Sequence, residues 1–132
     1  IMTIYRTRPR LPAGQATQVS VQAALLAQIE TSHCGLLPAA QLPAMLAVQQ
    51  QRDRRMAERL LAAPTPAVLL AGAFHVRRDL GVPLHLQDLA APDGSERVLI
   101  LAETGQAVSA ERADFVWYTP AMPAQDHCAS MR

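Results

Sequence analysis

The chain contains no lysine, and all of its basic residues are arginines. This absence excludes a Schiff-base lysine and a Walker-type phosphate loop within these 132 residues. The 12 basic residues face 11 acidic residues, so the formal net charge is only +1. Because a polyanion binder needs a clear cationic excess or stripe, we expect no nucleic-acid partner.

Aromatic residues and cysteines are also scarce. Aromatic side chains make up 4% of a chain that is 50% hydrophobic, so the core must be built mainly from Leu, Ala, Val and Met. Two cysteines, Cys34 and Cys128, are too few for a disulfide-built fold, although one bridge could form in an oxidising compartment. No apolar run reaches the length of a membrane span, and the opening residues do not read as a signal peptide.

The pattern along the chain predicts helices followed by short buried strands. Residues 1–17, with several arginines and prolines, are expected to form an extended arm or linker. A first helix should begin at Ser20 as N-cap and close at Gly35, and a longer one should end at Pro64. Continuous apolar runs predict three strands, at residues 66–74, 97–103 and 113–120.

This order predicts the α/β class, with a small and mainly parallel sheet of about three strands flanked by helices on each side. Residues 1–132 would form a single domain or the carboxyl-terminal portion of a larger one. So small a sheet needs further strands at its edge, from a missing segment or from a second copy of the chain.

The long helix carries polar residues where its inner face should be apolar. One stripe at spacings of three and four consists of Leu42, Met45, Leu46, Gln49, Asp53, Met56 and Leu60. A buried carboxylate such as Asp53 is costly unless it is paired. Either Asp53 forms a structural ion pair with Arg52 or Arg77, or it orients a ligating or catalytic histidine.

His75 follows the first predicted strand and precedes two arginines. Ligands of open α/β sheets bind outside the carboxyl ends of the strands, so His75 is either a turn residue or part of a ligand site. Arg77 and Arg78 could clamp carboxylates there. His85 and His127 lack such neighbours and are expected at the surface or in turns.

Two further positions have both a structural and a chemical interpretation. His33 and Cys34 are adjacent at a helix end, which makes them a poor chelating pair, and His33 would favour the helix C-terminus as a cation. A Cys–His dyad stays open, although no third group or oxyanion loop supports it. Tyr118 is either a half-buried strand residue or a tyrosinate ligand of ferric haem.

Three segments in order, "SHCGLLP", "QQQRDRRMAERL" and "GAFHVRRDLGVPLHL", resemble one protein family, with "ADFVWYTP" as a weaker fourth. The chain resembles the ChaN-like, iron-regulated haem-binding lipoproteins of bacteria over about Ser32 to Leu86. Family members are usually longer and carry an early G-E-x-H-type motif, which residues 1–31 do not match. The resemblance therefore covers the carboxyl-terminal part of the family fold.

The resemblance implies a periplasm-facing lipoprotein of the outer membrane that binds haem for iron acquisition. It also implies a homodimer, and contact with the membrane only through a lipid anchor. His75 and Tyr118 are the candidate iron ligands, and no residue is assigned a catalytic role. The full set of candidate haem-pocket residues is His33, Arg52, Asp53, Met56, His75, Arg77, Arg78 and Tyr118. The alternative is a metal-dependent hydrolase of the related erythromycin-esterase and TIKI type, with a divalent metal near His75 and Asp53.

Overall fold

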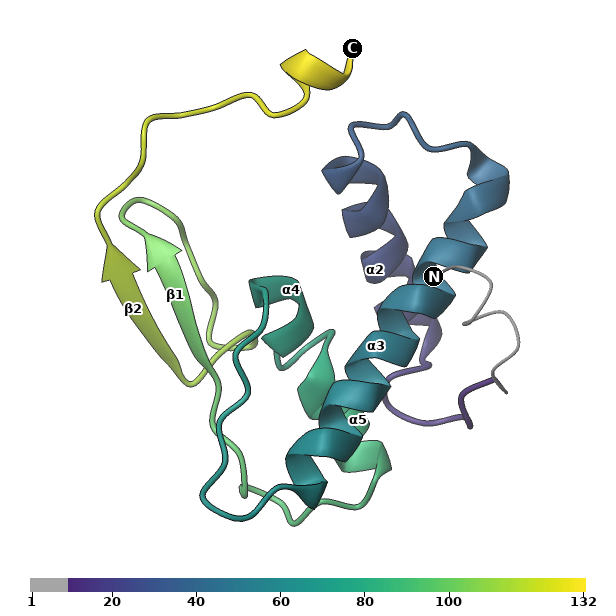
Figure 1. Ribbon diagram of the computed structural model, residues 1–132, viewed down its shortest axis with the longest axis vertical. Helices are drawn as coiled ribbons and strands as arrows, with labels where there is room; N and C mark the ends of the chain where they lie inside the picture. The colour runs from purple at the N-terminus through teal and green to yellow at the C-terminus, as the bar shows by residue number, and fades with distance from the viewer. Residues whose placement is uncertain (1–9) are drawn as a thin grey trace.

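The computed structural model describes residues 10–132, and the first nine residues of the predicted arm lie outside the described part. Three helices stand on one side of the molecule and a two-stranded sheet stands on the other, with a short helix between them (Figure 1). In chain order the elements are α2 (Val19–Ser32), a 3-10 turn (Ala39–Gln41), α3 (Leu42–Ala62), α4 (Ala73–Val76), α5 (Val82–Asp88), β1 (Leu99–Glu103), β2 (Phe115–Thr119) and a second 3-10 turn (Ala129–Met131). The predicted α/β class is confirmed.

Helix α2 forms where the apolar spacing predicts it. Val21, Leu25 and Ile29 are buried on one face, and Gly35 follows the helix at a φ of 66°, where its N–H donates to the Glu30 carbonyl at 2.9 Å. This left-handed turn is the helix ending that glycine favours. The predicted N-cap is wrong, because the helix already begins at Val19 and Gln18 precedes it without a side-chain cap.

Helix α3 is the central helix, since it packs on both α2 and α5 (Figure 1). Its predicted stripe faces two small cores: Leu46 packs toward α2, while Met56 and Leu60 pack toward α5. Asp53 lies between these apolar contacts and is fully buried. The helix therefore keeps a carboxylate inside the molecule at the position where the stripe turns polar.

The sheet consists of β1 and β2, which pair in parallel with Leu99 opposite Phe115. The alternation of a strand sends Ile100 and Ala102 inward, into a core with Val76 of α4. The opposite face is open: the exposed fractions of Leu101 and Trp117 are 66% and 65%. In the described residues the helix that packs on the sheet is the one-turn α4, on one face, and not helices on both faces as predicted.

The first predicted strand is not a strand. Residues 66–72 form no regular secondary structure, and the sheet of residues 10–132 contains only β1 and β2. A strand needs a neighbour to pair its backbone groups. Here Val68 and Leu70 stay in solvent, 83% and 90% exposed, while Leu69 packs against the core between α3 and α5. The run then ends in α4, so His75 lies on a one-turn helix and not at a strand end.

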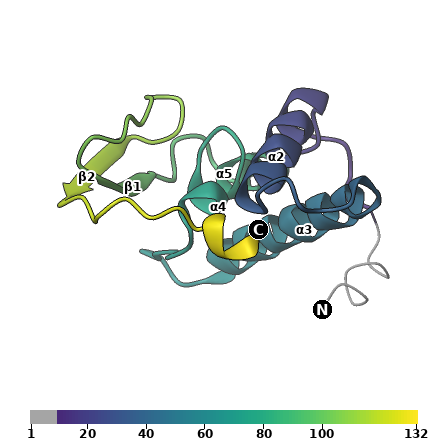
Figure 2. The ribbon, with the colours of Figure 1, turned by 90° about the horizontal axis from the view of Figure 1, so that it is seen from above.

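The described part of the predicted arm is fixed to the helices. The Asp88 carboxylate accepts hydrogen bonds from the N–H groups of Gln15 (2.7 Å) and Ala16 (3.0 Å). The Gln50 side chain donates to the Ala16 carbonyl at 2.6 Å, and Ala16 itself is buried. Seen from above, the C-terminal segment runs back from β2 toward the helices (Figure 2). None of the helices within residues 10–132 is long and apolar enough to cross a bilayer.

Candidate functional site

The buried carboxylate of α3 meets the histidine of α4. His75 Nδ1 lies 2.5 Å from Asp53 Oδ1, and Gln49 Nε2 lies 3.2 Å from the same ring nitrogen. An ionised Asp53 only accepts hydrogen bonds, so the Nδ1–H of His75 donates to it and Nε2 carries the lone pair. The partner of Asp53 is thus His75, and the predicted structural pair with Arg52 or Arg77 is wrong.

Burial controls the charge of this pair. Desolvation raises the pKa of Asp53 above its ordinary value of 3.8, while the hydrogen bond from His75 and, when the ring is protonated, its charge act in the lowering direction. Asp53 Oδ2 is buried and has no hydrogen-bond partner within the described residues, and the His75 side chain is 24% exposed. The pair therefore joins a desolvated acid to an imidazole that solvent can reach.

Gly81 allows the chain to turn back against α4. A Cβ atom built on Gly81 would lie 2.0 Å from the His75 carbonyl oxygen, a distance that real Cβ atoms do not show. The Gly81 N–H also donates to the Arg77 carbonyl at 2.9 Å. Since α5 begins at the next residue, this glycine fixes the position of α4, and of His75, relative to α5.

The two arginines after His75 are already paired with carboxylates. Arg77 forms two hydrogen bonds to Asp79, at 2.8 and 2.6 Å, and its guanidinium lies 5.7 Å from the centre of the Phe74 ring. Arg78 bonds to Glu96 at 3.1 Å and to Asp114. Both guanidinium groups are therefore engaged in ion pairs within the protein. The pairing of Arg77 with Asp79 could have been suggested by the R-R-D sequence alone.

Asp114 also connects the Arg78 pair to the sheet. Its carboxylate accepts a hydrogen bond from the Val98 N–H at 2.7 Å, just before β1. This backbone bond, followed by the charge and hydrogen bond of Arg78, outweighs the opposing effect of desolvation and holds the pKa of Asp114 below its usual value. Arg78 therefore ties the segment after α4 to the start of both strands.

The remaining candidates lie apart from one another. Tyr118 is 51% exposed on β2 and lies opposite Ala102 in the register. It shares its sheet face with Val116, which packs against the same core as Val76 of α4. Met56 lines an apolar groove between the end of α3 and the extended segment at Val68 and Leu69. Met56 therefore lines a groove that His75 does not line, and Tyr118 lies on the sheet.

Two further candidates do not join the Asp53–His75 pair. His33 Nδ1 lies 2.8 Å from the Ile29 carbonyl oxygen at the end of α2, which agrees with the helix-end interpretation of this residue. Arg52 is exposed on α3, whereas its neighbour Asp53 points inward.

His85 was expected at the surface or in a turn, and this prediction is wrong. Its side chain is 1% exposed within α5, and its Nε2 atom is buried without a hydrogen-bond partner among residues 10–132. Burial lowers the pKa of His85 from 6.5 to about 4. The sequence did contain a sign of this burial. His85 stands between Leu84 and Leu86, in the apolar segment that follows Gly81.

The residues that can gather around a metal ion lie elsewhere. In the described part of the chain, the group of at least three His, Cys, Asp or Glu side chains with suitably close donor atoms consists of Cys34, His127 and Cys128. Among residues 10–132, no third His, Cys, Asp or Glu side chain lies close enough to His75 and Asp53 to complete such a group. The divalent metal of the hydrolase hypothesis therefore lacks a complete ligand set in these residues.

A buried carboxylate that holds the Nδ1 side of an imidazole is the partner that metal-ligating histidines usually have and is also the arrangement of a general base, here on a small α/β scaffold. The family model for "Haem-binding uptake, Tiki superfamily, ChaN" matches residues 5–86, and the chain belongs to this family. The resemblance predicted from the three sequence segments is thereby confirmed.

A solved structure shows the same fold. ChaN of Campylobacter jejuni, described as binding haem cofacially, is similar to this chain with a TM-score of 0.71 and 29% sequence identity. The match covers 86% of this chain and 44% of that protein, so the chain spans less than half of the length of its relative. A comparison with curated proteins found no match.

Proposed function

We propose that the chain binds haem and serves bacterial iron or haem acquisition. The observation that carries this proposal is the Asp53–His75 pair, which lies inside the segment that matches a haem-binding family. A histidine that ligates iron usually donates its other ring N–H to a carboxylate or carbonyl, which fixes the ring and raises its basicity. The 2.5 Å contact at Nδ1 supplies that partner and leaves Nε2 as the donor atom.

The residues present fit haem in part. His75 would hold the iron, and bound haem would supply the redox-active metal and a broad apolar surface. Asp53 keeps the imidazole oriented, and its buried position strengthens that hydrogen bond because water does not compete for it. Arg77 and Arg78 would meet the propionates only by exchanging their present carboxylate partners.

We assign the iron to His75 in preference to Tyr118. A tyrosine ligates haem iron as the tyrosinate, so Tyr118 would have to lose its phenolic proton. Its side chain is half exposed on the strand. His75 needs no such ionisation, since its neutral form already presents a lone pair.

The proposal includes a site of action at the periplasmic side of the outer membrane, reached through a lipid anchor. The disulfide between Cys34 and Cys128 supports an oxidising compartment. It also includes a homodimer, which the open apolar sheet face with Leu101 and Trp117 supports, because a contiguous exposed apolar patch is typical of an interaction surface. Light scattering on the purified chain, with and without haemin, measures this association.

A haemin titration followed at the Soret band tests the proposal. We expect a saturable shift for the wild-type chain, a clear loss of affinity for His75→Ala, and wild-type behaviour for Gln125→Ala, an exposed position in the C-terminal segment. Tyr118→Phe should also bind as the wild type does. A shift that does not saturate, or one that His75→Ala leaves unchanged, contradicts the assignment.

The second candidate is a metal-dependent hydrolase, which the same Asp53–His75 pair favours. A buried carboxylate that orients a histidine is also the arrangement of a general base. Such an enzyme needs metal ligands in addition to the residues described, because no third ligand stands beside this pair within residues 10–132. Metal analysis separates the candidates: stoichiometric divalent metal without haem binding favours the hydrolase, whereas a chain that resists metal loading and binds haemin excludes it.

A further inference from the structure

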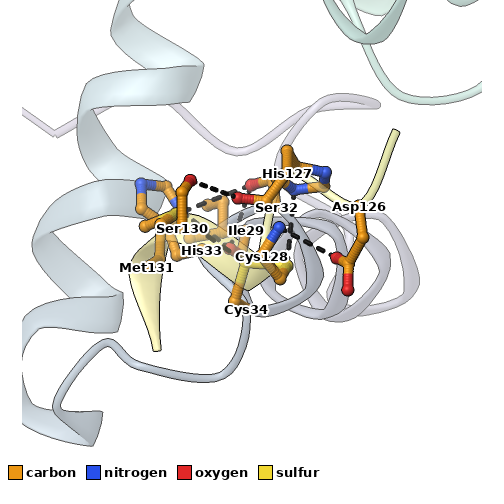
Figure 3. Close-up of a disulfide and its surroundings, with 9 residues drawn as sticks. All are labelled: Ile29, Ser32, His33, Cys34, Asp126, His127, Cys128, Ser130 and Met131. Carbon is orange, nitrogen blue, oxygen red and sulfur yellow. Dashed lines mark hydrogen bonds between the residues drawn. A yellow bond between two sulfur atoms is a disulfide. The ribbon is translucent and has the colours of Figure 1, made fainter.

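A second cluster of donor atoms joins the end of α2 to the C-terminal segment (Figure 3). Cys34 lies in the turn after α2, at a φ of 59°, and forms a disulfide with Cys128, 94 positions further along the chain. The Asp126 carboxylate accepts a hydrogen bond from the Cys128 N–H at 3.0 Å, which folds the segment into the second 3-10 turn. This local structure brings soft ligand atoms from two distant segments together.

The donor set is compact. The ligand atoms of Cys34, His127 and Cys128 all lie within 4.8 Å of one another. His127 Nε2 is 3.5 Å from Cys128 Sγ, and the thioether sulfur of Met131 is 3.8 Å from Cys34 Sγ. His127 and Met131 are exposed and both cysteines are half-buried, so a reductant and an ion can reach the group.

We propose that the reduced form of this cluster is a binding site for Cu(I), with Cys34, Cys128 and His127 as ligands and Met131 as a fourth. Thiolate and thioether sulfurs are soft donors that select Cu(I) over harder cations, and an imidazole completes the set. Met131 distinguishes the site from a zinc site, whose ligands are thiolates, imidazoles and carboxylates. This proposal does not depend on haem binding at His75.

The disulfide makes the site conditional on the redox state. A dithiol reductant transfers two electrons and two protons to the Cys34–Cys128 bond: its own thiols join in a disulfide, and the two cysteine thiols are released. Binding of Cu(I), supplied in its reduced state, then displaces the thiol protons. The oxidised protein offers neither thiolate, so oxidation removes the site.

Competition with a coloured Cu(I) chelator tests the proposal on the whole chain under anaerobic conditions, after a phosphine has reduced one sample and has been removed, so that the oxidised sample keeps its disulfide. The reduced wild-type protein should withdraw one equivalent of Cu(I) from the chelator, whereas the oxidised protein and the Cys34→Ser/Cys128→Ser variant should withdraw none. Circular dichroism checks that the reduced protein keeps its helices. Excess Zn(II) should not displace the bound Cu(I).

Exposed ligands give variants that do not depend on the cysteines. His127→Ala and Met131→Leu should each weaken Cu(I) binding by roughly tenfold or more. Loss of a residue that only hydrogen-bonds to a metal ligand already costs about that much affinity. Gln125→Ala, an exposed control in the same segment, should bind as the wild type does. The proposal is overturned if reduced protein withdraws no more Cu(I) than the double serine variant, if His127→Ala and Met131→Leu both bind normally, or if Zn(II) displaces the copper.

Discussion

The buried His85 should make the protein sensitive to mild acid. Its pKa in the folded state is about 4, against an ordinary value of 6.5, because burial penalises the charged ring more than the nearby Asp88 favours it. Between these two values the unfolded chain binds more protons than the folded chain, so stability is complete above pH 6.5 and falls as the pH drops toward 4. Each pKa unit corresponds to about 1.4 kcal/mol, so this histidine alone should remove about 2 kcal/mol between pH 8 and pH 5.

The perturbation is His85→Leu, which replaces the imidazole in α5 with an apolar side chain of similar size and so removes the titrating group. Urea unfolding of both proteins at a series of pH values gives the free energy of unfolding at each pH. The wild type should lose about 2 kcal/mol more than the variant on going from pH 8 to pH 5. The exposed His127→Gln serves as control and should follow the wild type. Parallel curves for the wild type and His85→Leu would refute a buried neutral imidazole.

Three further predictions follow from contacts of the fold and the site. Gly81→Ala should lower the free energy of unfolding by about 1–3 kcal/mol in urea melts, because its Cβ meets the His75 carbonyl, while Gly72→Ala, whose nearest contact is 3.8 Å away, should be tolerated. Reducing the disulfide should lower the urea-derived stability by about 2–4 kcal/mol, since it closes a loop with a sequence separation of 94; an unchanged midpoint would contradict this. Asp53→Asn should weaken haemin binding by about tenfold or more in the Soret titration, and equal affinity would show that Asp53 does not support His75.

The sequence predicted well what depends on local pattern. The apolar spacing of α2 and α3 and the continuous runs of the two strands were sufficient, because each element buries a face that its own residues define. The polar interruption at Asp53 correctly marked a special position, and the partner of Asp53 was within the motif that the sequence singled out at His75.

What failed depends on partners that a linear pattern does not contain. An apolar run such as Val68–Leu70 becomes a strand only if another segment pairs with it, and this pairing is long-range information. The burial of His85 likewise depends on α3 packing over α5. The carboxylate partners of Arg78 come from Glu96 and Asp114, far along the chain, so spacing could not reveal that this arginine was already engaged.

Iron ligation by His75 is tested most directly by resonance Raman spectroscopy of the ferrous haem complex. We expect an iron–histidine stretching band in the wild type that disappears in His75→Ala and returns as an iron–imidazole band when free imidazole fills the space. The same band should shift in Asp53→Asn, because the hydrogen bond at Nδ1 tunes the basicity of the ligand. A wild-type complex without the band, or a band that survives in His75→Ala, would contradict iron ligation by His75.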